Sequence, residues 1–206
     1  MNKWKRLLFL FLGINLVALS VNLFLRANLG SDPLTVLQEG LHLALGISVG
    51  QASLLYNAIV LAVAFFFAKK GLGIGTFVYI LLVGGFIDGY GMLFDLIKFS
   101  GLSLPSRIAS FVLGQLALSI GFALVIHVKF GTNGLDALLL VIEEKLTIPY
   151  RTLKTVADIL YTLAGALMGG VVGLGTVVSM LTTGLLVSSI RKRLQKKEEL
   201  VRADTD

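Results

Sequence analysis

The chain contains no cysteine, and proline accounts for only 3 of its 206 residues. Without cysteine, the sequence excludes disulfides and thiolate chemistry. Charged residues are also scarce, at 15% of the chain, whereas 56% of the residues are hydrophobic. A soluble domain cannot hide so much apolar surface from water, so the surroundings must be largely lipid. At this length we expect one membrane domain, residues 1–206.

Six hydrophobic runs are long enough, at roughly 20 residues each, to cross a bilayer as helices. They lie at 7–25, 52–68, 75–97, 106–126, 153–171 and 174–190. The first run follows Lys3, Lys5 and Arg6, but it is too long for a signal peptide and lacks a small-residue cleavage site. The sequence therefore predicts an all-α integral membrane protein with about six transmembrane helices.

The basic residues are distributed unevenly along this topology. With the N-terminus inside, 15 of the 18 Lys and Arg residues fall on the inner side, leaving Arg26, Lys98 and Arg107 outside. The excess inside predicts that both termini are cytoplasmic, in the plasma membrane of a bacterium. The tail 191–206 is strongly basic, and we expect it to bind anionic lipid rather than nucleic acid.

Two parts of the chain share a polar break that follows a hydrophobic run. Residues 26–37 read RANLGSDPLTVL, and residues 127–138 read HVKFGTNGLDAL. A shift of 101 residues superposes the two breaks, and a shift of 100 superposes GLGIGT at 71–76 on VVGLGT at 171–176. The common order of break, span and glycine-threonine turn indicates an internal repeat.

The two halves, about 7–98 and 106–191, each hold three of the predicted spans. Because three is odd, the second half must enter the membrane from the opposite side. The sequence thus predicts two inverted-topology repeats, an arrangement found in several transporter folds. Duplication for stability alone is the alternative.

Each half also contains a short helix after its first span, at 33–45 and 135–146. Asp32 is suited to cap the first of these helices and Pro33 to occupy its first turn, while Asn133 is suited to cap the second. Both segments are apolar on one side and too short to span. They either lie in the membrane interface or enter it as re-entrant half-helices, whose N-termini favour an anionic group. The sequence leaves these alternatives open.

The first break resembles that of the YczE/YyaS/YitT-type bacterial membrane proteins, particularly of the YczE/YyaS branch. That branch carries an Arg, a Leu-Gly pair and an Asp-Pro, which correspond here to Arg26, Leu29–Gly30 and Asp32–Pro33. The resemblance covers about residues 7–190 and implies a membrane bundle. It implies no particular activity or substrate.

The second half matches the same families through Gly131, Asp136 and the GLGT turn at 173–176. It departs from them at 133–136, where Asn-Gly-Leu-Asp stands and the family often has a Pro before the Asp. We therefore expect the second short helix to start differently from that of the family.

Two carboxylates fall inside predicted spans, where a charged side chain costs roughly 2.5–3.5 kcal/mol on insertion scales. Asp88 and Asp158 are therefore candidates for proton or cation coupling. The alternative is that each pairs with an Arg or Lys or caps a broken helix. His42 and His127, with no cysteine or carboxylate cluster, do not predict a metal site, and we expect no cofactor.

Arg26 is suited to bind an anionic substrate group, although a local pair with Asp32 is the more frequent arrangement for such neighbours. Asp136 and Arg151 offer a second pair of this kind on the inner side. The residues that we expect to bind a substrate are Arg26, Asn28, Gly30, Asp32, Pro33, Thr35, Asn57, Thr76, Gly131, Asn133, Asp136, Arg151, Asp158 and Thr176.

The leading hypothesis for function is a small-molecule permease with a central site between the two repeats. The alternative is a non-transporting membrane partner, such as a substrate-binding subunit or a regulator of another system. An enzyme is not expected, because no Ser/His, paired-carboxylate or metal constellation is present. The glycine-rich faces are compatible with a homodimer.

Overall fold

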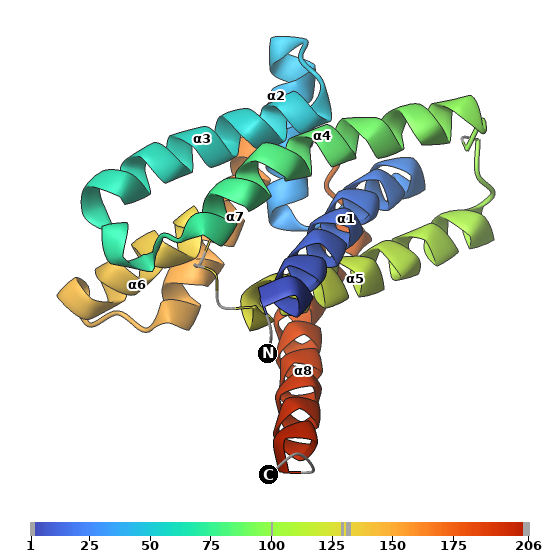
Figure 1. Cartoon of the computed structure of the whole chain (residues 1–206). Helices are drawn as coiled ribbons and strands as arrows, with labels where there is room; N and C mark the ends of the chain where they lie inside the picture. The colour runs from blue at the N-terminus through green and yellow to red at the C-terminus, as the bar shows by residue number, and fades with distance from the viewer. Residues whose placement is uncertain (1–2, 100, 129, 131–132, 204–206) are drawn as a thin grey trace.

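The computed structural model describes residues 3–99, 101–128, 130 and 133–203, and this part of the chain is helical with no strand (Figure 1). Its elements are α1 (Lys3–Ala27), α2 (Pro33–Leu45), α3 (Val49–Phe67), the 3-10 turn η1 (Lys69–Gly71), α4 (Ile74–Leu96), α5 (Leu104–His127), α6 (Gly134–Leu146), α7 (Tyr150–Leu167) and α8 (Leu174–Ala203). The predicted all-α class is confirmed.

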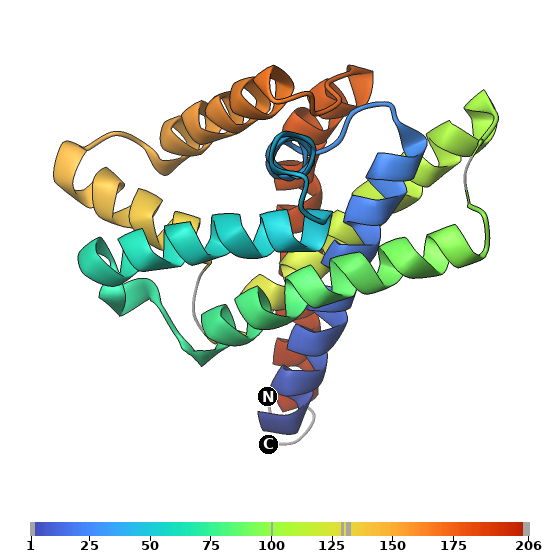
Figure 2. The same ribbon diagram turned by 90° about the horizontal axis from the view of Figure 1, so that it is seen from above.

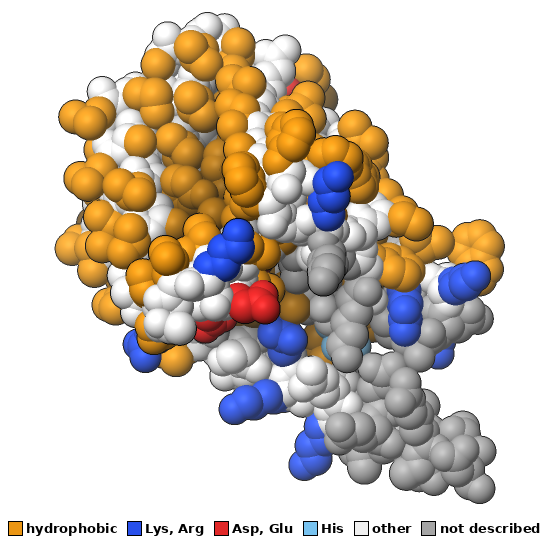
Figure 3. Space-filling model, turned by 90° about the vertical axis from the view of Figure 1, so that its left-hand side faces the viewer, with side chains coloured by type: hydrophobic (Ala, Val, Ile, Leu, Met, Phe, Trp, Pro, Cys, Tyr) orange, Lys and Arg blue, Asp and Glu red, His pale blue; other side chains and the backbone are white. Residues whose placement is uncertain are grey.

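Within the part of the chain that the structure describes, five helices, α1, α3, α4, α5 and α8, are long and apolar enough to cross a membrane. Many of their large side chains point away from the protein, such as Phe66, Leu81 and Leu181, which are 69–75% exposed. Figure 3 shows that such hydrophobic side chains cover much of one face, with Lys and Arg gathered below them. Exposure of this kind suits a lipid environment, which supports contact with the bilayer. The run predicted at 153–171 corresponds to α7, which is not among the five.

The short helices begin and end at the residues that local chemistry favours. Asp32 caps α2 by accepting a hydrogen bond from the Thr35 amide, and Asn133 caps α6 by accepting one from the Asp136 amide. The prediction of both N-caps is therefore confirmed. α2 ends at Gly46 and α6 at Thr147, both in the left-handed conformation that terminates a helix.

The centre of the molecule is the antiparallel pair of α1 and α5. A Cβ atom placed on Gly13 would lie 3.2 Å from Leu124 Cβ, and one placed on Gly114 would lie 3.2 Å from Leu23 Cβ. The glycines thus let the two helices approach closely along their length. Ile14 and Phe24 of α1 and Leu118 of α5 are almost fully buried in the resulting core.

α4 and α8 begin against the breaks in the opposite half of the chain. The amide of Gly75 donates a hydrogen bond of 3.0 Å to the carbonyl of Phe130, and the amide of Gly175 donates one of 2.9 Å to the carbonyl of Leu29. α4 then packs on α1, and α8 packs on α5. The two hydrogen bonds correspond to each other, because Gly75 and Gly175 are 100 residues apart and Leu29 and Phe130 are 101 residues apart.

The remaining helices α2, α3, α6 and α7 form a closed ring, in which each helix contacts the next: α2 with α3, α3 with α6, α6 with α7, and α7 with α2. Figure 2 shows this group, with α2 seen end-on between α3 and α7. We call it the four-helix ring. It combines one short and one long helix from each half of the chain.

Candidate functional site

The four-helix ring holds a group of polar and aromatic side chains that the structure brings together from both halves. Tyr56 of α3 and Tyr161 of α7 meet across the ring, with their hydroxyl oxygens 2.7 Å apart and their rings edge to face at 5.5 Å. Asp136 lies close enough to act electrostatically on both tyrosines. This group is the candidate functional site.

Asp32 lies at the N-terminus of α2 and is 7% exposed. Its carboxylate accepts hydrogen bonds from the hydroxyl and the backbone amide of Thr35. Burial raises the pKa of Asp32 above its ordinary range, because the charged form is deprived of water, and the hydrogen bonds from Thr35 oppose that rise. The break therefore places a buried carboxyl at the edge of the ring.

Asp136 occupies the corresponding part of the second half, in the first turn of α6. It accepts a hydrogen bond of 2.6 Å from the hydroxyl of Tyr150. On the same face of α7, Lys154 Nζ lies 2.5 Å from Asp158 Oδ1. Burial raises the pKa of the Asp136 carboxyl, and the Tyr150 hydrogen bond and the charge of Lys154 counteract this.

The Lys154–Asp158 pair connects the two breaks electrostatically. Lys154 lowers the pKa of both Asp32 and Asp136, and Asp158 raises both. Three carboxylates thus lie within electrostatic reach of one ammonium group. Such a cluster can balance the charge of a bound solute, because it places carboxylates and an ammonium group side by side.

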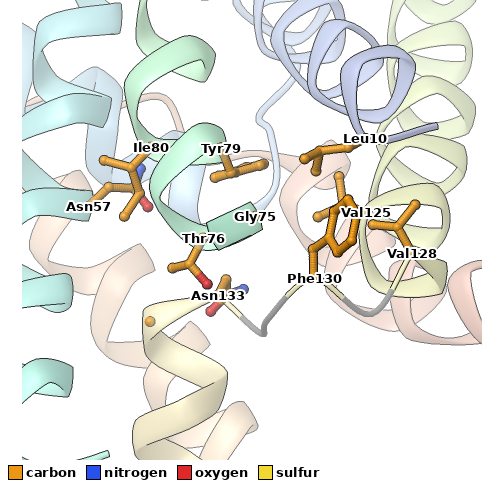
Figure 4. A pocket seen from close by; sticks show the side chains of 11 residues that line it. Leu10, Asn57, Gly75, Thr76, Tyr79, Ile80, Val125, Val128, Phe130 and Asn133 are labelled. Carbon is orange, nitrogen blue, oxygen red and sulfur yellow. The ribbon is translucent and has the colours of Figure 1, made fainter. Parts of the chain in front are cut away.

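A small cavity adjoins the ring on the side of α4 (Figure 4). Tyr79, Asn57, Thr76 and Asn133 contribute polar groups to its wall, and Leu10, Val125 and Phe130 contribute apolar ones. Its volume is about 20 Å³, room for about one water molecule. Tyr79 also lies within electrostatic reach of Asp32 and Asp136, so the cavity borders the polar group.

Two expected ion pairs are wrong. Arg26 does not pair with Asp32 but with Asp95 at the end of α4, because both side chains project from helix ends that lie side by side. Asp136 pairs with the Tyr150 hydroxyl instead of Arg151, whose side chain is exposed. Arg26 and Arg151 therefore lie outside the polar group.

Asp88 and Asp158 both have protein partners. Asp88 caps α3, since it accepts hydrogen bonds from the Ser48 hydroxyl at 2.6 Å and the Gly50 amide at 2.8 Å. Asp158 pairs with Lys154. Asp88 is therefore held at the start of α3, whereas Asp158 faces the other carboxylates.

Several other predicted positions serve the turns that connect the two halves. Thr76 and Thr176 each accept a hydrogen bond of 3.3 Å from the amide three residues earlier, and so close the start of α4 and α8. Gly30 has a φ of +91° and lies against Thr176 and Gly173, where a side chain would overlap them. The carbonyl of Asn28, whose side chain is exposed, accepts a hydrogen bond from Arg107. These residues shape the site rather than line it.

Pro33 and Thr35 lie in the first turn of α2, and Asn57 hydrogen-bonds to Ser53 and reaches the cavity. Gly131 lies outside the described residues. The sequence reasoning missed the tyrosines at 56, 79, 150 and 161. A signal was present, because Tyr150, Lys154, Asp158 and Tyr161 recur at helical spacing and define one polar face of α7.

The helices of the described residues, five of them long and apolar enough to cross a membrane, define an all-α membrane protein. The chain belongs to a family of unknown function, DUF6198, whose model matches residues 4–192. It is 25% identical to the "Uncharacterized membrane protein YczE" of Bacillus subtilis, over 87% of this chain and 82% of that protein. It is 27% identical to the "Uncharacterized protein YyaS" of the same organism, over 85% of this chain and 87% of that protein.

A third relative, an "Uncharacterized protein" of Haemophilus influenzae, is 28% identical over 90% of this chain and 83% of its own length. No solved structure matches the chain. The predicted resemblance to the YczE/YyaS branch is confirmed, and it supports a membrane location for this chain.

Proposed function

We propose that the chain is a small-molecule permease whose two halves are inverted repeats around a central site. The observation that carries this proposal is the polar group inside the four-helix ring, to which both halves contribute. Polar groups in a membrane interior are costly and mark substrate or ion pathways. The corresponding contacts of Gly75 with Phe130 and of Gly175 with Leu29 support the inverted relation.

In this proposal α7 is the sixth crossing. Gly175 places the start of α8 beside the end of α1, so the chain must cross the membrane between α6 and α8. α7 is more polar than the other spans because Lys154, Asp158 and Tyr161 lie on its inner face. Its other face exposes Ile159, Leu160 and Leu163, as expected for lipid contact.

The proposed orientation has both termini in the cytoplasm of a bacterial cell. The start of α1 and the end of α8 lie at the same end of the molecule (Figures 1 and 2), as an even number of crossings requires. The basic end of α8 then meets the inner leaflet, where anionic lipid attracts it.

Transport by alternating access would proceed by rearrangement of the ring helices around the group formed by Asp32, Asp136, Asp158, Lys154 and the tyrosines. α2 and α6 contribute the short helices that enter this group. The carboxylates supply coupling by protonation, and no catalytic step is part of this proposal.

The test is flux in proteoliposomes. The purified chain is reconstituted and screened with labelled amino acids, sugars, nucleosides, organic acids and amines. We expect saturable uptake for one class, reduced at least about tenfold in Asp136→Asn and Asp158→Asn, because each change removes a charged hydrogen-bond partner that contributes roughly 1.5–3 kcal/mol. Glu144→Gln, which removes an exposed carboxylate from α6, is the matched control. Absence of saturable uptake for every class contradicts the proposal.

A second function, a non-transporting partner of another membrane protein, is favoured by the size of the cavity. A space of about 20 Å³ holds about one water and no larger solute. Purification from native membrane separates the two functions: a stoichiometric second protein supports the partner role, and a homodimer or a monomer supports the permease.

A further inference from the structure

The two long helices of the ring, α3 and α7, oppose each other without packing together. Neighbouring helices of the ring pack directly against each other. Across the ring, α3 and α7 are joined through side chains, and the hydroxyl oxygens of Tyr56 and Tyr161 lie 2.7 Å apart. The edge-to-face arrangement of their rings adds an aromatic contact between the same two residues.

The Tyr56–Tyr161 pair lies beside the polar residues of the ring. Tyr56 is 9% exposed and lies within electrostatic reach of Asp136 and Tyr79. Tyr161 lies within reach of Lys154 and Asp158. The pair therefore joins α3 to α7 directly beside the carboxylates.

We propose that the Tyr56–Tyr161 pair is the gate of the ring, and that its opening exposes the buried ring residues, such as Asp32 and Ser53, to water. The two tyrosines belong to different halves of the chain, so movement of one half against the other separates them. Loss of one hydrogen bond shifts the equilibrium between the closed and the open ring by roughly 2- to 12-fold. A contact of this strength keeps the ring mostly closed but still lets it open.

The role of this gate in transport rests on the proposed function, but the gate itself can be tested without a solute. The chain has no cysteine, so single cysteines can be introduced directly. Ser53→Cys reports on the ring, since Ser53 is 1% exposed and bonds Gln38 between α2 and α3. Ser119→Cys reports on the α1–α5 core, where Ser119 is fully buried.

The experiment measures the rate at which N-ethylmaleimide labels each reporter in detergent or vesicles. Tyr56→Phe and Tyr161→Phe should raise the rate at position 53 by roughly 2- to 12-fold, because each removes the hydroxyl–hydroxyl bond. The double variant should exceed neither single variant, since both remove the same bond. The rate at position 119 should stay unchanged.

Tyr90→Phe is the matched control, because the Tyr90 hydroxyl bonds Asn15 at 3.2 Å between α4 and α1, away from the ring. An unchanged rate at position 53 in the ring variants overturns the gate, and so does an equal rise in Tyr90→Phe or at position 119. Failure of the flux assay with the labelling pattern intact overturns the transport function alone.

Discussion

Gly40 of α2 and Gly165 of α7 lie so close that a Cβ atom on Gly40 would come within 2.9 Å of the Gly165 Cα atom. On the other side of the contact, a Cβ atom on Gly165 would lie 2.7 Å from the Leu37 amide nitrogen. Backbone atoms cannot move aside as side-chain ends do. The ring therefore depends on two glycines, one from each half of the chain.

We predict that Gly165→Ala destabilises the protein by about 1–3 kcal/mol, the usual cost of overpacking. The control is Gly184→Ala in α8, where the added Cβ would meet nothing within 4 Å apart from its chain neighbours and the nearby backbone of its own helix. Both changes gain the same helix propensity, so their difference isolates the clash. The measurement is the fraction that stays monodisperse after heating in mild detergent. Equal loss in both variants would show that α2 and α7 are not in close contact.

Cysteine labelling from the two sides of the membrane should decide whether α7 crosses. Thr147→Cys, at the end of α6, should react with an impermeant maleimide only from the cytoplasmic side. Val172→Cys, which is 47% exposed before α8, should react only from the outside. Lys192→Cys in the basic end of α8 serves as the cytoplasmic reference. Reaction of positions 147 and 172 from the same side would exclude six crossings.

The sequence was sufficient where structure is determined locally. Asp32 and Asn133 cap their helices because the side chain bonds an amide only three residues ahead, which no distant contact can readily alter. The five long apolar runs likewise became helices at nearly the predicted positions, since bilayer thickness sets their length.

The sequence was insufficient where the partner is distant along the chain. Arg26 has Asp32 nearby in sequence, but its partner Asp95 is 69 residues away and is brought near only by the packing of α4 on α1. Tyr56 and Tyr161 are separated by 105 residues, and no local pattern joins them. Mean hydropathy alone also fails to identify α7 as a possible span, because the face of α7 that carries Lys154, Asp158 and Tyr161 is polar.

Two arginines near the C-terminal end of α1 should differ in their effect on stability. Arg107 donates to the carbonyls of Ala27 and Asn28, at the C-terminus of α1, where a positive charge is favourable. Arg26 pairs with Asp95, whose side chain is 69% exposed. Arg107→Gln should cost about 1.5–3 kcal/mol, as expected for charged hydrogen bonds, and Arg26→Gln less than about 1 kcal/mol.

Heating in detergent at about 0.05 M and about 0.5 M salt checks this difference, because salt screens exposed pairs much more than partly buried contacts. The Arg26→Gln effect should shrink at high salt, and the Arg107→Gln effect should persist. A larger loss for Arg26→Gln would mean that the Arg26–Asp95 pair, rather than the cap on α1, contributes more to stability at this end of α1.

The stability of the protein should depend on pH through Asp32. Because burial raises the pKa of this carboxyl, the folded state binds its proton more tightly than the unfolded state does. Its contribution is therefore fully present below the ordinary carboxyl pKa of 3.8 and is lost as pH rises through the raised value. Asp32→Asn keeps an N-cap acceptor but cannot ionise, so the variant should gain stability relative to the natural chain as pH increases.

Thr35→Val distinguishes this explanation from a general effect of the substitution. The hydrogen bonds from Thr35 hold the pKa of Asp32 down, and loss of the hydroxyl bond should raise it further. The pH at which stability falls should then move upward in Thr35→Val, while the fall should diminish in Asp32→Asn. Thermal unfolding between about pH 4 and pH 8 measures both, since this window spans the ordinary carboxyl range and the values above it. Parallel pH profiles for all three proteins would show that Asp32 is not the titrating group.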